Sequence, residues 1–312
     1  MRAGLAAMLA SLCVVAATAQ AATLDYQLVA RAVADGVYVV EGSNADFAPA
    51  NGCNIINTGF VVTDAGVVVV NTGPSRRYGE QLRALIARST PQPVALVIHL
   101  NLHPDYFLGN QAFADVPRRA TPVTRAGMAR EARAYEDNLY RLCGDWMSGT
   151  EALLPDADMA PGVLRVGGRE LEVRELKGLT ASDLVLIDRR TGIGFAGGLV
   201  FSERAPTTPH ADLPAWLGSL SVLESLPAST VRQWIPSHGR VDSTTALAQT
   251  RSYLLWLHRH LFDAADLGLD INDVLRLSAP AAQRGLAAFE SEYVRNVSHL
   301  YPRYEQAVWQ RR

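Results

Sequence analysis

Buried strands alternate with helices along both halves of the chain, and this alternation limits the fold class more than any other feature of the sequence. Residues 67–70 are four consecutive valines, a run typical of a strand buried on both faces. A turn follows at 71–75, and residues 78–88 repeat apolar side chains at helical spacing. The next buried strand is expected at 94–100. This order of elements predicts an α/β protein whose mixed sheets are covered by helices.

The remaining elements extend the same alternation. The 312 residues, 48% of them hydrophobic, can form a large core, and this composition excludes intrinsic disorder. A formal net charge of -2 excludes a strongly basic surface for nucleic acid. Further strands are expected at 36–40, 55–63, 163–166, 170–176, 183–188, 193–196 and 231–235, and helices at about 124–142, at about 212–225 and from about 244 to the end.

The N-terminus has the three parts of a cleavable signal peptide. Arg2 supplies the positive charge, residues 5–17 form an apolar run, and Ala19-Gln20-Ala21 is a cleavage site of the small-x-small type. The run is short for a bilayer span, which needs about 20 residues. We therefore expect residues 1–21 to be removed and the mature chain to be exported, to the periplasm if the source is Gram-negative.

Two cysteines, Cys53 and Cys143, remain after this cleavage. An oxidising compartment permits a disulfide between them, which would close a loop of about 90 residues and contribute roughly 4 kcal/mol in the chain-entropy model. Two buried free thiols are the alternative that the sequence leaves open. We favour the disulfide, because two is the smallest even number and export disfavours unpaired thiols.

A loop rich in potential metal ligands follows the strand expected at 94–100. His103 and Asp105 are two residues apart, so in an extended loop their side chains point to one side, as a divalent metal requires. The carboxyl end of a buried strand is also where open α/β sheets place ligand sites. Taken alone, this His-x-Asp pair is better explained by ordinary loop capping than by a metal site.

Several short motifs occur here in the order of the metallo-β-lactamase superfamily, which the chain therefore resembles. More narrowly, residues 145–151, 204–212 and 253–257 resemble segments of the exported quinoprotein-relay zinc metallohydrolases, found beside pyrroloquinoline-quinone-dependent dehydrogenases. The superfamily motifs are Gly36-Val37-Tyr38, Asn57-Thr58-Gly59-Phe60, the strand and turn at 67–73, His103-Pro104-Asp105, Gly109-Asn110 and Pro236-Ser237-His238-Gly239.

This resemblance covers about residues 30–275 and implies an αβ/βα sandwich of two mixed sheets flanked by helices. We place the metallo-β-lactamase-like domain at 22–245 and a C-terminal helical extension, packed on that domain, at 246–312.

The same resemblance implies seven metal-ligand positions, of which this chain keeps three. The matching residues are His103, Asp105 and His238. The superfamily's first zinc site is left with Asn101, His103 and Leu179, and its second with Asp105, Tyr106, His238 and Gly198, so the replaced positions are Asn101, Tyr106, Leu179 and Gly198.

These replacements remove most of the chemistry that the superfamily's zinc supplies. One imidazole and one neutral amide cannot provide the three strong ligands of a catalytic zinc, so the first site is expected to be empty. Loss of the bridging carboxylate and of the first metal removes the pair that lowers the pKa of bound water. His103, Asp105 and His238 still offer two imidazoles and one carboxylate. We therefore expect no cofactor, or one zinc ion if this residual site is functional.

Other polar residues receive plainer interpretations. His210, in a Thr-Thr-Pro-His segment near the expected pocket mouth, is either a substrate-binding residue or a capping or surface group. Asp183 is expected to fix its own loop, and His99 to point away from the site. Ser75 and Ser237 have no Ser-His-Asp context in the sequence, which argues against a serine hydrolase.

Two functional hypotheses follow. The first is an exported non-catalytic protein that binds a small molecule or a periplasmic partner in the former active-site cleft, in the context of quinoprotein-dependent oxidation of alcohols or aldehydes. The alternative is a hydrolase of a thioester, a lactone or a related small substrate, working with one metal at Asp105 and His238, with Asp105 as its catalytic residue.

Overall fold

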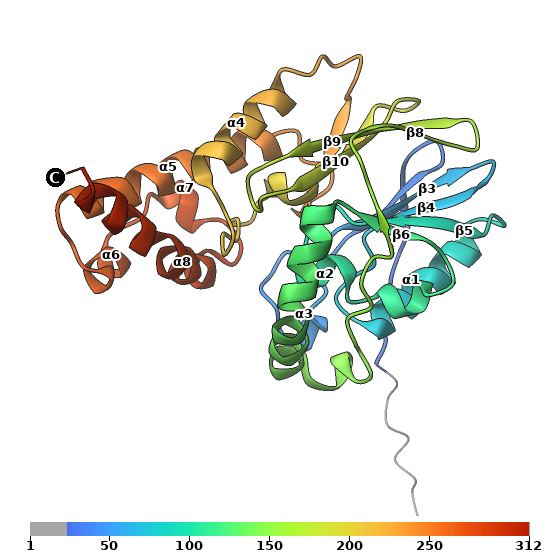
Figure 1. Cartoon of the computed structure of the whole chain (residues 1–312), viewed down its shortest axis with the longest axis horizontal. Coiled ribbons are helices and arrows are strands. Elements are labelled where there is room, and N and C mark those ends of the chain that lie inside the picture. The colour runs from blue at the N-terminus through green and yellow to red at the C-terminus, as the bar shows by residue number, and fades with distance from the viewer. Residues whose placement is uncertain (1–23, 312) are drawn as a thin grey trace, which may run out of the picture.

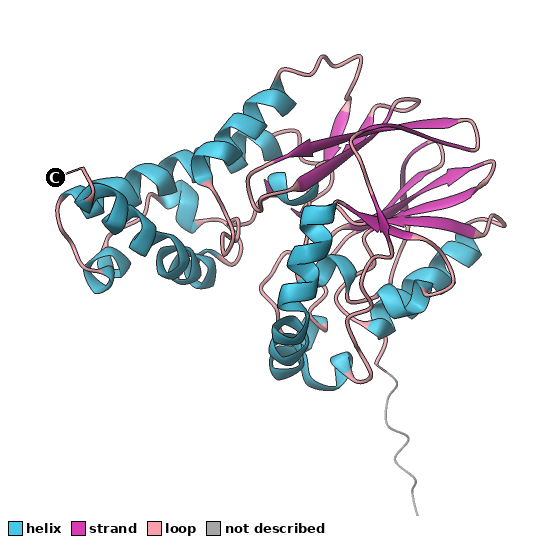
Figure 2. Ribbon diagram, viewed as in Figure 1, coloured by secondary structure: helices cyan, strands magenta, loops and turns pink. Residues whose placement is uncertain are grey.

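The computed structural model describes residues 24–311 (Figure 1). The signal peptide expected at 1–21 lies outside the described residues. The fold class is α/β, as predicted: two large sheets are stacked, helices cover their outer faces, and further helices gather at one end of the molecule (Figure 2).

The first sheet has seven strands that follow one another in chain order. Neighbours are antiparallel from β1 to β4 and parallel from β4 to β7. The strands are β1 (Arg31–Ala34), β2 (Val37–Val40), β3 (Thr58–Thr63), β4 (Gly66–Val70), β5 (Val94–Ile98), β6 (Arg118–Ala120) and β7 (Ala157–Asp158).

The second sheet has five strands in the order β13-β11-β10-β9-β8. Only its β11–β13 pair is parallel, and a separate two-stranded parallel pair joins β12 to β14. The strands are β8 (Gly162–Val166), β9 (Arg169–Leu176), β10 (Asp183–Asp188), β11 (Ile193–Phe195), β12 (Phe201–Ser202), β13 (Gln233–Ile235) and β14 (His238–Gly239).

Eight α-helices are present in residues 24–311, and three of the longer ones begin at a side-chain cap. Ser75, Thr121 and Asp212 each accept a hydrogen bond from a backbone N–H of the first turn of α1, α3 and α4. The helices are α1 (Arg76–Ser89), α2 (Pro104–Phe107), α3 (Pro122–Cys143), α4 (Leu213–Glu224), α5 (Ala246–Asp266), α6 (Ile271–Arg276), α7 (Ala281–Arg284) and α8 (Phe289–Trp309).

The four valines of β4 show how the layers are held together. Val68 and Val70 pack between the two sheets, in a core that includes Leu184 and Leu186 of β10. Val67 and Val69 point the other way, into a core shared with α1. Because alternate side chains of a strand face opposite ways, this one run anchors two layers, as its continuous apolar character predicts.

A third core joins the outer face of the second sheet to the C-terminal helices. Val185 of β10 belongs to the same buried cluster as Trp216 of α4, Leu254 of α5 and Tyr293 of α8. The hydroxyl of Thr250 on α5 also accepts from the backbone N–H of Phe201 at 3.0 Å. The helices after residue 245 therefore share their apolar core with the second sheet. None of the helices within residues 24–311 is long and apolar enough to cross a membrane.

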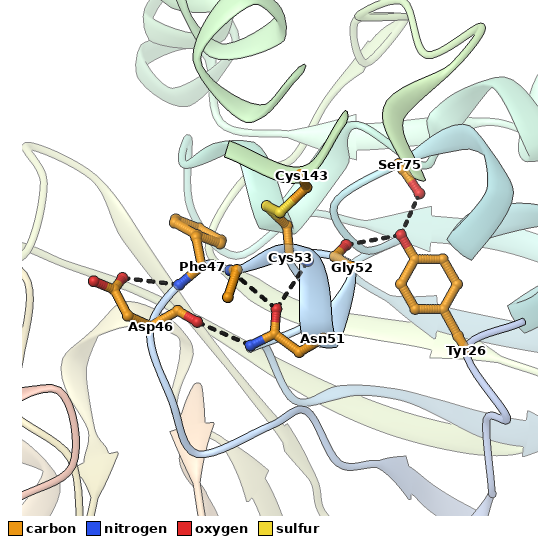
Figure 3. The surroundings of a disulfide bond; sticks show 9 residues. Tyr26, Asp46, Phe47, Asn51, Gly52, Cys53, Ser75 and Cys143 are labelled. Atoms are coloured by element: carbon orange, nitrogen blue, oxygen red, sulfur yellow. Dashed lines mark hydrogen bonds between the residues drawn. A yellow bond between two sulfur atoms is a disulfide. The ribbon is translucent and has the colours of Figure 1, made fainter. Parts of the chain in front are cut away.

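A disulfide joins Cys53 and Cys143, which confirms the predicted pairing and rules out two free thiols (Figure 3). It links the loop before β3 to the C-terminal end of α3. Tyr26 braces the same loop, since its hydroxyl donates to the carbonyl oxygen of Gly52 at 2.9 Å and contacts Ser75 Oγ at 2.9 Å.

Candidate functional site

A cavity of about 610 Å³ opens where loops of both sheets meet α3 and α8. His103 and Asp105, at the start of α2, and His238 of β14 line it, so the fold gathers the three retained ligand positions in one place. His210, the candidate substrate-binding residue, lines the same cavity from the loop before α4. The volume is typical of a small-molecule site.

Asp105 and His238 are paired with each other. Asp105 Oδ2 lies 2.8 Å from His238 Nε2, and both side chains are buried. The other ring nitrogen, Nδ1, lies 2.9 Å from Ser237 Oγ, and Phe201 stacks on the ring with centroids 5.0 Å apart. Burial lowers the pKa of His238, and the hydrogen bond to Asp105 opposes this shift. Both nitrogens of this imidazole therefore have partners within the protein.

His103 is paired with His210 instead of with the other retained positions. Its Nε2 lies 3.2 Å from His210 Nδ1, and its backbone N–H donates to Asn101 Oδ1 at 3.0 Å. Burial, reinforced by the neighbouring His210, lowers the pKa of His103 to about 3. Burial also lowers the pKa of His210, whose Nε2 lies 4.0 Å from Glu131 Oε1. Both rings are therefore neutral at neutral pH.

Three of the four replaced positions pack against one another and against Asp183. Asn101 Nδ2 donates to Asp183 Oδ1, and the backbone N–H of Thr180 donates to Asp183 Oδ2 at 2.8 Å. A Cβ atom added to Gly198 would lie 2.5 Å from Leu179 Cδ2, 2.8 Å from Asn101 Nδ2 and 3.0 Å from Asp183 Oδ1. The space for a bridging carboxylate is therefore filled by protein atoms.

The fourth replaced position, Tyr106, is a buried neutral phenol. Its ring is fully buried and its hydroxyl oxygen is shielded from solvent. Burial, followed by the nearby charge of Asp105, raises its pKa well above 10. A phenolate ligand is therefore disfavoured at this position.

These arrangements do not fit the dinuclear zinc centre that the resemblance implies. A catalytic zinc needs three protein ligands beside its open position. Within residues 24–311, no three His, Cys, Asp or Glu side chains are arranged to hold an ion. Asp105 Oδ2 is bonded to His238 Nε2, His103 Nε2 is bonded to His210 Nδ1, and a Cβ atom at Gly198 would clash with its neighbours.

The structure corrects one sequence interpretation. The sequence shows no context for Ser237, yet the fold aligns Ser237, His238 and Asp105 in one hydrogen-bonded row. The hydroxyl of Ser237 also contacts the carbonyl oxygen of Val200 at 3.1 Å, and Ser237 is buried. Ser237 does not line the cavity and is therefore not placed as a nucleophile. Its contact with Nδ1 instead orients the His238 ring.

Two further groups of cavity residues were missed in the sequence because they lie on helices far from the motif loop. Their spacing is the signal that was available, since both sets repeat at intervals that keep side chains on one helix face. They are Glu131, Tyr135, Asn138, Arg141 and Leu142 on α3, and Glu292, Arg295 and His299 on α8.

Asp183 and His99 lie where the sequence interpretation puts them. Asp183 holds its turn through Thr180, and burial raises its pKa to about 7. His99 is fully buried, does not line the cavity, and has Nδ1 3.1 Å from the carbonyl oxygen of Tyr106.

Solved structures share this fold. A metallo-β-lactamase from Pontibacter korlensis is similar to the chain with a TM-score of 0.59 and 24% identity, over 73% of this chain and 99% of that one. Metallo-β-lactamase IND-7 is similar with a TM-score of 0.60 and 20% identity, over 74% of this chain and 100% of that one. TMB-1 is similar with a TM-score of 0.55 and 18% identity, over 73% of this chain and 97% of that one. No protein-family model and no curated protein matches the sequence. The chain therefore has the metallo-β-lactamase fold, with a C-terminal helical region.

Proposed function

We propose that the protein is an exported, non-catalytic relative of metallo-β-lactamase-fold hydrolases that binds a small molecule in the former active-site cleft. The packed group of Asn101, Leu179, Gly198 and Asp183 is the observation that carries the proposal. A protein that had lost only one ligand would keep an open metal site. Here the space itself is closed, while the adjoining cavity of about 610 Å³ is retained.

The cavity lining favours a polar small molecule with an apolar part. Phe47, Ile55 and Leu142 give it apolar walls, while Glu131 and Arg295 supply charge near its opening. The segments that resemble quinoprotein-relay metallohydrolases favour alcohols, aldehydes and the acids derived from them as ligands. They also favour a periplasmic role beside a quinoprotein dehydrogenase.

Zinc content and hydrolysis together test this proposal. The mature protein, purified without an affinity tag and dialysed after exposure to excess zinc, is expected to retain fewer than two zinc ions per chain. It should hydrolyse nitrocefin, thioesters and lactones no faster than buffer does. Two bound zinc ions, or a zinc-dependent rate that Asp105→Ala abolishes, would overturn it. A thermal-shift screen of short alcohols, aldehydes and carboxylic acids then searches for the ligand.

A single-metal hydrolase is the second candidate. It is favoured by one observation, that His103, Asp105 and His238 all line the same cavity. This candidate requires the Asp105–His238 hydrogen bond to open so that both side chains can reach an ion. It predicts that Asp105→Ala and His238→Ala lose the same hydrolytic rate, and it fails if neither substitution changes any rate.

A further inference from the structure

We infer that a groove between α5 and α8, the C-terminal groove, is a second ligand site that takes a carboxylate with a single apolar chain. Its volume is about 300 Å³, and it lies at the end of the molecule where the C-terminal helices gather (Figure 1). It shares no lining residue with the cavity that Asp105 and His238 line, so the inference does not depend on the proposed function. The lining residues that carry the argument are Asp212, Phe262, Leu300, Arg303, Ala307 and Arg311.

The walls of the C-terminal groove are largely apolar. Leu213 of α4 and Leu300 of α8 are each 2% exposed, and Phe262 of α5 is half-buried. Leu300 and Ala307 are seven positions apart, which places them on one face of α8. An apolar strip along a helix favours an apolar chain that lies lengthwise beside it. Because the volume is at the lower end for small-molecule sites, it suits one chain and not a two-chain lipid.

Arg303 is the group that would bind the carboxylate. Its guanidinium donates to the carbonyl oxygens of Ala211 at 2.9 Å and Pro209 at 3.4 Å, so the segment before α4 holds it in place. A guanidinium has five N–H donors, and these two bonds leave donors for the paired, charge-assisted hydrogen bonds that it makes with a carboxylate. None of the ion pairs within residues 24–311 involves Arg303.

The other charged groups of the C-terminal groove leave it positive. Asp212 is the only carboxylate among its described lining residues, and that carboxylate already caps α4 by accepting from the backbone N–H of Ala215 at 3.0 Å. Arg311 adds a second guanidinium, which lies over the Phe262 ring at 5.7 Å from its centroid. Two arginines against one carboxylate favour an anionic head over an alcohol or an amine on the same chain.

Calorimetric titration of the tag-free protein with sodium octanoate tests the site, with octan-1-ol and octylamine as the uncharged and cationic probes. One octanoate per chain is expected, bound more tightly than either of the other probes. Arg303→Gln is expected to weaken octanoate binding by roughly tenfold or more, the value of a hydrogen bond to a charged group, and to leave octan-1-ol binding unchanged. Arg141→Gln is the matched control, because this exposed arginine lines the other cavity, and it should leave both affinities unchanged.

Filling the C-terminal groove gives a second readout that leaves both arginines in place. Ala307 is exposed and lines the groove, whereas the neighbouring Gln306 is exposed and does not line it. Ala307→Phe should abolish octanoate binding and Gln306→Phe should keep it, and thermal unfolding curves show whether both variants keep the fold.

Three results would overturn the inference. The first is octanoate bound no more tightly than octan-1-ol. The second is an octanoate affinity that is unchanged in Arg303→Gln or in Ala307→Phe. The third is an affinity lost in Arg141→Gln but kept in Arg303→Gln, which would place the carboxylate in the other cavity. Zinc retention and hydrolysis, which test the proposed function, are measured separately, so the two failures are distinguishable.

Discussion

The side-chain amide of Asn101 donates to the carboxylate of Asp183, and this bond joins the loop after β5 to a turn 82 residues further along the chain. A Cβ atom added to Gly198 would meet both of these residues and Leu179 within about 3 Å. Gly198 thus lies in a packed group that leaves no room for a larger side chain at this position.

A carboxylate placed at Gly198 should therefore destabilise the protein. Gly198→Asp would push a side chain against Leu179 and place a second carboxylate beside Asp183. Overpacking of this kind costs about 1–3 kcal/mol, and a buried like charge adds to it, so urea denaturation should show a loss of about 3 kcal/mol. Gly218→Asp is the matched control, because no atom lies within 4 Å of a Cβ at this exposed position of α4. Equal stability of the two variants would contradict the packed group.

Sequence patterns predicted most of the fold because runs and periods of apolar residues mark the buried strands and helices. The valine run of β4 and the strand at Asp183–Asp188 were placed within one residue of their observed bounds. The strand expected at 55–63 starts only at Thr58, since the backbone of Ile56 and Asn57 pairs with His238 and Ser237 instead. Such long-range bonds leave no periodic signal in the sequence.

The candidate site was less predictable, because its pairings join distant segments. The motif comparison identified His103, Asp105 and His238 by position, but their partners depend on how the loops close. That His103 faces His210 and not His238 is a property of the folded chain, and no spacing rule relates residues 107 positions apart.

Removal of the disulfide should cost a large part of the stability. The Cys53–Cys143 bond closes a loop of sequence separation 90, and the chain-entropy model assigns between about 4 and 5 kcal/mol to a loop of that size. Urea denaturation of the native chain should shift to lower urea when dithiothreitol is added. The double variant Cys53→Ser/Cys143→Ser should unfold near the reduced position with or without dithiothreitol. An unchanged midpoint for the reduced native chain would contradict this prediction.

The buried ion pair between Arg204 and Glu292 should contribute far more than a surface pair. Both side chains are 2% exposed and their charged atoms are 3.0 Å apart, joining the loop after β12 to α8. Glu292→Ala leaves the Arg204 charge buried with less compensation, which costs about 3–5 kcal/mol. Arg204→Met/Glu292→Leu should recover much of this loss, because it removes both charges. Glu224→Ala, which breaks the more exposed pair with Arg251, should cost less than about 1 kcal/mol. Similar losses in the free energy of unfolding for Glu292→Ala and Glu224→Ala would contradict the larger contribution expected of the buried pair.

Stability should fall as the pH drops below about 6.5, and His99 should account for part of that fall. Burial, reinforced by the charge of Arg118, lowers the pKa of His99 from 6.5 to about 4, so the folded state keeps this ring neutral while the unfolded chain protonates it. Because the pKa of His99 is lower in the folded state than in the unfolded state, its contribution to the free energy of unfolding is fully present above pH 6.5. This contribution is lost as the pH falls from 6.5 toward 4. At pH 5 the His99 share is about 2 kcal/mol, from 1.36 kcal/mol per pKa unit.

His99→Asn can keep the bond to the carbonyl oxygen of Tyr106 but cannot take up a proton. The free energy of unfolding, measured in urea at pH 7.5 and pH 5, should therefore decrease less for His99→Asn than for the native chain. An equal decrease in both proteins would show that His99 is protonated alike in the folded and unfolded states.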